Sequence, residues 1–199
     1  MQKFNVIFSN PDLVGLEVEV SHEGIFCLDR DTELENYVDS VKFKLVCWSE
    51  NGKEFIGNIN VIRIPSNYRL PSYFAPCYDM GKAMDVIEGC NMPDVQKVIM
   101  NPIHSKIQNA LKNSDLYYIS EVFTKEKYRN CGIGSDFLNL LPELIEHYFG
   151  QKDPLLCLVI SPIDVPDDMS KKQAHQKLEN FYQRNGFELY GNDVAVKCP

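Results

Sequence analysis

The first third of the chain alternates apolar and polar residues with the two-residue period of half-buried strands. The alternation covers Leu16–Val20 and Val41–Trp48, and a further β-rich run covers Phe55–Ile64. Polar residues and a glycine at Ser49–Lys53 separate the last two runs. Two strand patterns joined by a short polar turn predict a hairpin, so we expect antiparallel sheet in this part of the chain.

Beyond residue 114 the chain alternates strand patterns with helix patterns. Short apolar runs indicate strands at Leu116–Thr124, Leu155–Ile160, Phe187–Leu189 and Val194–Val196. Apolar residues three and four positions apart indicate helices at Ile133–Phe149 and Ser170–Asn185. This order of strands and helices predicts an α/β or α+β sheet with a crossover helix.

Residues 65–113 differ from both flanking parts because prolines recur between short helical patterns. Five of the eleven prolines lie there. The apolar spacing indicates helices at Met80–Ile87, Val95–Met100 and Ile103–Leu111. We therefore expect a single domain, residues 1–199, in which 65–113 is a helical insertion and 115–197 is the core.

Composition and cysteine spacing exclude several classes of protein. The 199 residues include 28 acidic and 20 basic side chains, a net charge of −8, which argues against a general nucleic-acid or anionic-membrane binder. The seven cysteines are scattered and form no Cys-x-x-Cys pair, so neither a disulfide framework nor a zinc site is predicted. The chain shows no secretory signal and no run long enough to span a bilayer. We expect a cytoplasmic protein without metal, nucleic-acid or membrane partners.

Two glycines mark the junction between the strand Leu116–Thr124 and the helix Ile133–Phe149. The junction reads Arg129-Asn130-Cys131-Gly132-Ile133-Gly134-Ser135. Glycines let backbone N–H groups approach a ligand closely, and a helix N-terminus carries partial positive charge. Lys125, Lys127 and Arg129 add cations, so the junction predicts a cradle for an anion such as a pyrophosphate. The spacing fits neither a Walker P-loop nor a dinucleotide fingerprint, whose third glycine would replace Phe137.

Three features in order resemble the GCN5-related N-acetyltransferase (GNAT) superfamily over residues 115–197. They are the glycine junction, the buried strand Leu155–Ile160, and a late helix that ends in Phe181-Tyr182-x-x-x-Gly186-Phe187. The resemblance implies a mixed, mostly antiparallel central sheet flanked by helices. The sequence departs from the family pattern at four positions. His175 and Leu178 replace the usual Asn and Ala, and Cys131 replaces a small or basic residue. Pro142 lies inside the cofactor helix, where it should remove one backbone hydrogen bond and bend the helix.

The resemblance also implies an acetyl-CoA site and the residues that form it. The backbone of Val122, Phe123 and Thr124 would bind the pantetheine arm. The backbone amides that would hold the pyrophosphate are those of Arg129, Asn130, Cys131, Gly132, Ile133, Gly134 and Ser135. Glu121 would take a proton from the acceptor amine, directly or through water, and Tyr182 would protonate the departing thiolate.

We therefore expect an acetyl-CoA-dependent N-acetyltransferase that acts on a primary amine of a small molecule or peptide by direct attack. Two alternatives stay open: a non-catalytic acyl-CoA-binding or protein-interaction module, and a transferase for a bulkier acyl group. Glu121 can equally be a solvated or paired carboxylate, and Tyr182 an aromatic residue of the core. The acidic residues Asp164, Asp167 and Asp168 are candidates for attracting a cationic acceptor. The acceptor and the oligomeric state, including a homodimer, are left open by the sequence.

Overall fold

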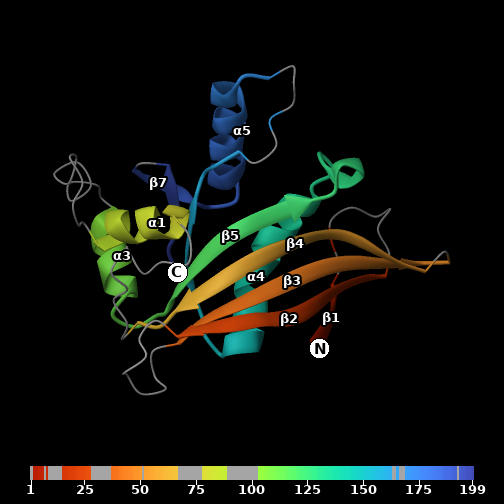
Figure 1. Cartoon of the computed structure of the whole chain (residues 1–199), viewed down its shortest axis with the longest axis horizontal. Helices are drawn as coiled ribbons and strands as arrows, with labels where there is room; N and C mark the ends of the chain where they lie inside the picture. Colours follow the sequence, from red (N-terminus) through yellow and green to blue (C-terminus); the bar gives the residue numbers. More distant parts are fainter. Residues whose placement is uncertain are drawn as a thin grey trace. The chain divides into compact units, whose positions relative to one another are not determined.

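A computed structural model of the chain forms two compact units, each assembled from two segments (Figure 1). Unit 1 comprises Met1–Ile64 and Ile119–Lys152, and unit 2 comprises Pro65–Tyr118 and Asp153–Pro199. The residues that the structure describes are 2–6, 8, 15–27, 37–50, 52–66, 78–88, 103–162, 165, 169–191 and 193–199. The single domain expected from the sequence stays a prediction.

The fold class is mixed α/β, with eight mostly antiparallel strands and four α-helices in the described residues, as predicted. Unit 1 contains β1 (Gln2–Val6), β2 (Leu16–Cys27), β3 (Tyr37–Ser49), β4 (Gly52–Ile64), the 3-10 turn η2 (Glu126–Tyr128) and α4 (Ile133–Phe149). Unit 2 contains α1 (Tyr78–Glu88), α3 (Ile103–Ala110), β6 (Leu155–Val159), α5 (Lys171–Arg184), β7 (Glu188–Gly191) and β8 (Val194–Lys197). The strand β5 (Leu116–Thr124) begins in unit 2 and ends in unit 1.

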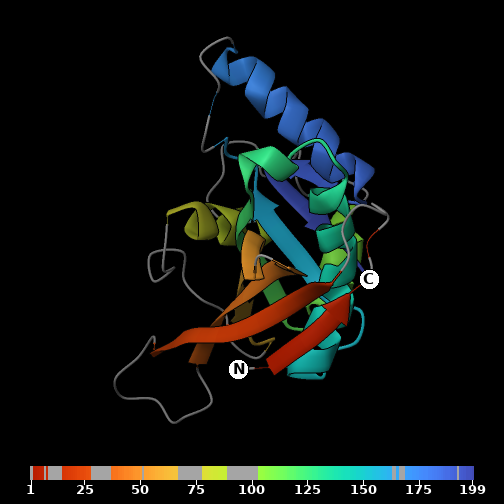
Figure 2. The same cartoon turned by 90° about the vertical axis from the view of Figure 1, so that its right-hand side faces the viewer.

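The sheet of unit 1 has one apolar face and one polar face. Its strands follow the order β1-β2-β3-β4-β5. Val20 pairs with Phe43, and Phe43 with Ile59, so these buried side chains lie on one face. α4 lies along this face (Figures 1 and 2), where the ring of Tyr148 meets that of Phe43 edge-on at 6.4 Å. The alternate residues of the same strands are largely polar and face the other way.

In unit 2 the strands follow the order β5-β6-β8-β7. The parallel pairing of β5 with β6 comprises three residue pairs, the last of which joins Tyr118 to Cys157. β8 is antiparallel to both β6 and β7. The predicted capping box starts α5, because the Ser170 hydroxyl accepts a hydrogen bond from the Gln173 backbone and the Gln173 side chain accepts one from the Ser170 backbone.

The predicted elements are largely confirmed, but several strands are longer than predicted, among them β2, which extends to Cys27, and one strand was not predicted. β3 and β4 extend into the expected turn, since Ser49 pairs with Gly52. β1 was not predicted, because its alternation over five residues is too short to stand out. α4 has its predicted bounds and includes Pro142. The predicted helix Val95–Met100 lies outside the described residues. Within the described part of the chain, no helix combines the length and apolarity needed to cross a membrane.

Gly57 sets how closely β4 approaches β5. It lies at a β-bulge, where the pairing of β3 with β4 shifts after Leu45. A Cβ atom on Gly57 would lie 2.3 Å from the carbonyl oxygen of Phe123 and 3.2 Å from the Cα of Thr124. Both atoms belong to the backbone and cannot move aside as a side-chain tip can. Only glycine therefore allows this spacing of the two strands.

We expect Gly57→Ala to lower the free energy of unfolding by about 1–3 kcal/mol, because overpacking displaces backbone. Urea denaturation of the purified variant measures the loss. Ser120→Ala, an exposed change on the neighbouring strand, is the control and should stay within about 0.5 kcal/mol of the wild type. A Gly57→Ala protein as stable as this control would show that β4 and β5 do not depend on the missing Cβ.

Candidate functional site

The loop between β5 and α4 has the backbone form of an anion cradle. Asn130 and Gly132 adopt left-handed conformations, with φ of 62° and 82°. Alternation of left-handed with ordinary residues turns successive N–H groups toward the same side of the chain. Gly132 is also the N-cap of α4 and has no side chain to cap the helix. The N–H groups of Cys131, Gly132, Ile133 and Gly134 have no hydrogen-bond partner among the described residues.

The next N–H groups are already used inside the helix. Ser135 and Asp136 both donate to the carbonyl of Gly132, at 2.9 and 3.0 Å. Of the residues predicted to hold a pyrophosphate, Ser135 and Arg129 therefore have backbone N–H groups that are already committed, since Arg129 donates to the Glu126 carbonyl at 3.0 Å. The unpartnered donors lie between these two residues, on residues that are exposed or half-buried except for Ile133.

The cationic side chains near this loop are engaged with the protein itself. Lys127 forms an ion pair with Glu54 of β4, and Lys125 lies 3.7 Å from the same carboxylate. The Tyr128 hydroxyl donates to Glu54 at 2.9 Å. The hydrogen bonds from Lys127 and Tyr128 lower the pKa of the Glu54 carboxyl. Glu54 thus fastens η2 to β4, and these lysines hold the loop in addition to any charge they offer a ligand.

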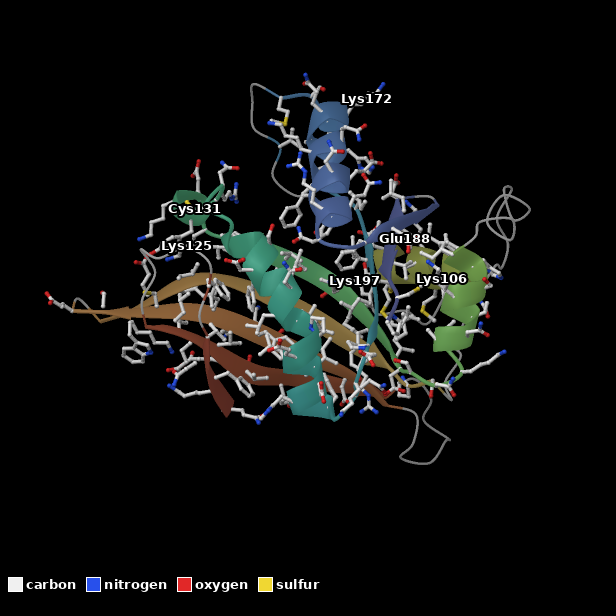
Figure 3. All side chains as sticks on the ribbon, turned by 180° about the vertical axis from the view of Figure 1, so that it is seen from behind. Lys106, Lys125, Cys131, Lys172, Glu188 and Lys197 are labelled. Atoms are coloured by element: carbon white, nitrogen blue, oxygen red, sulfur yellow. The ribbon has the colours of Figure 1, made fainter. Side chains whose placement is uncertain are left out.

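Arg129 also holds the loop, because its Nε donates to the carbonyl of Thr124 at 3.0 Å. Cys131 is exposed, and its thiol lies 3.5 Å from the Arg129 carbonyl. Figure 3 shows Cys131 at the loop before α4, with Lys125 at the end of β5.

The three residues predicted to bind pantetheine lie at the end of β5, beyond its last pair with β6. The Phe123 carbonyl points toward Gly57 of β4, while the Thr124 carbonyl accepts the bond from Arg129. Lys125 donates its N–H to Ile56 of β4 at 2.8 Å. Since backbone groups alternate along a strand, those of Val122 and Thr124 face away from β4.

Glu121 is fixed by two asparagines of β4. Its Oε2 accepts a hydrogen bond from Asn58 Nδ2 at 2.6 Å and another from Asn60 Nδ2 at 3.0 Å. Asn58 Nδ2 also donates to Asn60 Oδ1 at 3.1 Å, so the two amides orient each other. Asn58 is buried and Glu121 half-buried. The second carboxylate oxygen, Oε1, has no hydrogen-bond partner among the described residues.

The amide clamp of Asn58 and Asn60 was missed in the sequence. The signal was present, since both residues interrupt the otherwise apolar run Phe55–Ile62 at positions i and i+2, which share a face. Glu121 was identified, but its partners lie 61 and 63 residues away along the chain. A single sequence carries no direct sign of such a pairing.

Tyr182 lies on α5 in unit 2. Its side chain is 9% exposed and packs edge-on against Phe181 and Phe187, with ring centroids at 5.2 and 5.7 Å. Burial raises the pKa of Tyr182 to about 12. Its hydroxyl has no hydrogen-bond partner among the described residues. The phenol is therefore protonated at neutral pH, and its O–H is available to a ligand.

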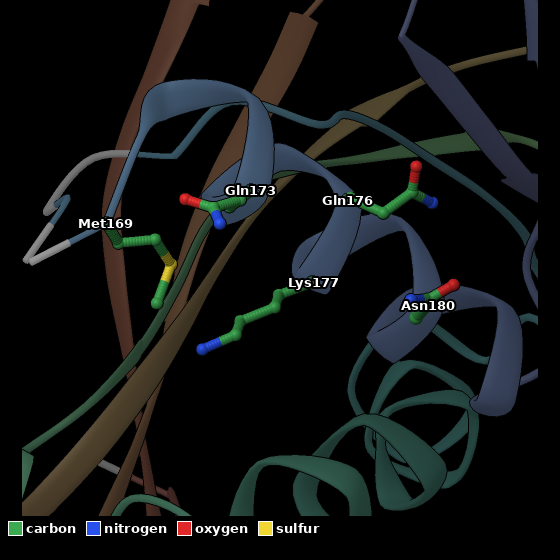
Figure 4. A pocket seen from close by; sticks show the side chains of 5 residues that line it. All are labelled: Met169, Gln173, Gln176, Lys177 and Asn180. Carbon is green, nitrogen blue, oxygen red and sulfur yellow. The ribbon is translucent and has the colours of Figure 1, made fainter.

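A depression of about 400 Å³ lies along one face of α5 (Figure 4). Its lining residues are Met169, Gln173, Gln176, Lys177 and Asn180. The last four are spaced at three, four and seven positions and so share a helix face. Neither His175 nor Leu178, the two departures from the family pattern on this helix, is among them. The acidic residues Asp164, Asp167 and Asp168 lie outside the described residues.

The structure brings together Glu121, the end of β5 and the glycine loop, all within unit 1. The described residues contain no group of three or more His, Cys, Asp or Glu side chains that could hold a metal ion. The site chemistry described in unit 1 is therefore a carboxylate and a set of backbone donors.

No family model matches the sequence, and no curated protein matches it. Among solved structures, the chain is similar to the crystal structure of a tyrosine-to-phenylalanine mutant of KacT, with a TM-score of 0.40 and 10% identity over 81% of this chain and 71% of that one. It is also similar to the crystal structure of a KacTA–DNA complex, with a TM-score of 0.40 and 9% identity over 91% of this chain and 92% of that one. At this level of likeness, neither structure assigns an activity or a partner to this chain.

We expect the stability of the variant Asn58→Asp to depend on pH. The substitution keeps the side-chain shape but places a second carboxyl group against Glu121. Two carboxylates at hydrogen-bond distance repel, so the pKa of the introduced carboxyl rises in the folded state. A raised pKa lets the folded state keep a proton at low pH and lose it as the pH rises. We expect a loss of roughly 2–3 kcal/mol in the free energy of unfolding at pH 8 and a clearly smaller loss at pH 5.

Urea denaturation at the two pH values measures this difference. Asn180→Asp, an exposed change on α5, adds the same charge without a neighbouring clamp and should show little dependence on pH. An equal loss at both pH values would show that the Asn58 amide does not contact Glu121 in solution.

Proposed function

We propose that the chain is an acetyl-CoA-dependent N-acetyltransferase that acts on a primary amine. The observation that carries the proposal is the run of unpartnered N–H groups at Cys131–Gly134, in a left-handed loop between β5 and α4. Such donors at a helix N-terminus suit a pyrophosphate, which accepts several hydrogen bonds and carries negative charge. The GNAT resemblance of residues 115–197 supports the same assignment.

The backbone groups at the end of β5 offer a binding position for the pantetheine arm of the donor. Val122 and Thr124 turn their backbone groups away from β4, and they lie beyond the last residue pair of β5 with β6. A pantetheine amide can bind such groups as a further strand would. Because Arg129 already occupies the Thr124 carbonyl, we assign this contact first to Val122. Phe123, whose carbonyl faces β4, is assigned a packing role.

The proposed chemistry is direct transfer. The amine nitrogen attacks the thioester carbonyl, the carbon–sulfur bond breaks, and the amine proton leaves toward Glu121 or a water bound to it. Glu121 suits this role because the clamp holds Oε2 and leaves Oε1 for the acceptor. Fixing the reactants in this way, together with backbone donors, supplies most of the proposed rate enhancement.

We assign Tyr182 to the departing sulfur, in a role different from the full proton transfer expected from the sequence. The pKa of Tyr182, about 12, lies above the ordinary thiol pKa of about 8.5. Transfer of the phenol proton to a thiolate is therefore unfavourable. A hydrogen bond from the phenol still stabilises the developing negative charge on sulfur. The proton that finally reaches the thiol then comes from water.

Calorimetric titration with acetyl-CoA, followed by a thiol-release assay over a panel of amines, tests the function. We expect binding, and thiol release with at least one amine. Binding without release for any amine would instead favour an acyl-CoA-binding module. A series of longer acyl donors would identify a preference for a bulkier group. Absence of binding to every acyl-CoA contradicts the proposal.

We expect Gly134→Asp to weaken acetyl-CoA binding by about 100-fold or more, because a carboxylate at the cradle repels the pyrophosphate and blocks its approach. Titration calorimetry on the folded variant measures the affinity. Asn139→Asp adds the same charge to an exposed position of α4 beyond its first turn and should bind nearly as the wild type does. Equal affinity of the Gly134 variant would remove the pyrophosphate from this loop.

We expect Tyr182→Phe to lower kcat by about 10- to 100-fold with little change in the Kd of acetyl-CoA. Its stability should be close to that of the wild type, because its hydroxyl has no partner among the described residues. Steady-state kinetics and calorimetry separate the two effects, with Tyr148→Phe on α4 as the control. An unchanged kcat would exclude Tyr182 from the reaction.

A further inference from the structure

The polar face of the unit 1 sheet carries charged and polar groups of both kinds beside Glu121. Two rows cross β2, β3 and β4. In the first row Ser21 pairs with Lys42, and Lys42 with Asn60, whose amide contacts Glu121. In the second row Glu19 pairs with Lys44, and Lys44 with Asn58, whose amide contacts Glu121 as well. Paired residues point to the same face, so all of these side chains lie opposite α4.

Lys44 differs from the other lysines of this face. Lys3 and Lys53 form ion pairs with Glu19, and Lys42 lies 3.4 Å from Glu23. Lys44 is half-buried and has no ion pair or hydrogen bond among the described residues, although Glu19 is its direct neighbour on β2. The Glu19 carboxylate is directed instead to Lys53, at 2.5 Å. The Lys44 ammonium is therefore available to an external anion.

Ser21 is a further polar residue of this face. Its hydroxyl oxygen is buried and has no hydrogen-bond partner in the part of the chain that the structure describes. Buried hydroxyls are nearly always satisfied, so an unsatisfied one calls for an explanation. Ser21 pairs directly with Lys42 and lies two residues after Glu19, on the same face of β2.

The geometry points to a zwitterionic acceptor, so we propose that the substrate is a free amino acid or a close analogue with an amine and a carboxylate a few bonds apart. Glu121 Oε1 would receive the amine, and Lys44 would bind the carboxylate. The two residues lie two strands apart, about 10 Å measured across the sheet at the usual strand spacing, and both side chains stand on the same face. The two charged residues together also discriminate against simple amines, because an amine without a carboxylate would leave the Lys44 ammonium without a partner.

This inference rests on the proposed function and concerns the same transfer. The amine nitrogen forms the new bond to the acetyl carbon, the thioester carbon–sulfur bond breaks, and the amine proton passes to Glu121 or its water. The carboxylate on Lys44 takes no part in bond changes. Its contribution is to place the amine, so it should appear in the specificity constant for the acceptor.

The test compares each amino acid with its carboxamide and with the amine that lacks the carboxyl group. Thiol release at saturating acetyl-CoA gives kcat/KM, corrected for the fraction of free-base amine at the assay pH. We expect the best amino acid to exceed its carboxamide by about tenfold or more. Equal or faster turnover of the carboxamide overturns the inference and leaves the proposed function standing. Release with no amine at all contradicts the proposed function itself.

The variant Lys44→Gln identifies the residue responsible. It should lower the ratio of amino acid to carboxamide kcat/KM by at least fivefold, and Lys44→Arg should restore most of that ratio. Lys152→Gln, at an exposed position after α4, is the control and should keep the wild-type ratio. An unchanged ratio in folded Lys44→Gln, judged by its thermal midpoint, overturns the role of Lys44. Should that variant fail to fold, the wild-type ratio alone still decides the substrate class.

Discussion

The close approach of β4 to β5 is the constraint on which the rest of the site in unit 1 depends. Gly57 allows the Phe123 backbone to lie where a Cβ would be. At that spacing the amides of Asn58 and Asn60 reach the Glu121 carboxylate, and Glu54, on the same strand, reaches η2. A wider spacing would weaken both contacts at once. The missing side chain of one glycine thus positions both the carboxylate and the loop.

The sequence predicted those elements whose signal is local. β5 and α4 have the predicted bounds because an apolar strand and a helical apolar spacing each extend over many residues. The capping box of Ser170 is likewise readable within four residues. The clamp could not be predicted in this way, since it joins residues about 60 positions apart. The pairing of β4 with β5 that brings them together has no reliable signature in a single sequence.

The charges of the loop illustrate the same limit. From the sequence, Lys125, Lys127 and Arg129 form one positive cluster ready for a phosphate. In the structure, Glu54 pairs with both lysines and Arg129 binds the Thr124 carbonyl. The anion cradle proposed here consequently depends more on backbone N–H groups than on side-chain charge. Backbone donors are fixed by the loop conformation, so they need little reorganisation when an anion binds.

A net charge of −8 describes the protein poorly at the scale of its sites. On the polar face of unit 1, lysines and carboxylates alternate across neighbouring strands, and most neutralise one another. Among the described residues of this face, the Oε1 atom of Glu121 and the ammonium of Lys44 have no hydrogen-bond or ion-pair partner. Recognition by a carboxylate and an ammonium together would favour a ligand with one charge of each sign. A ligand with a single charge would satisfy one group and leave the other desolvated.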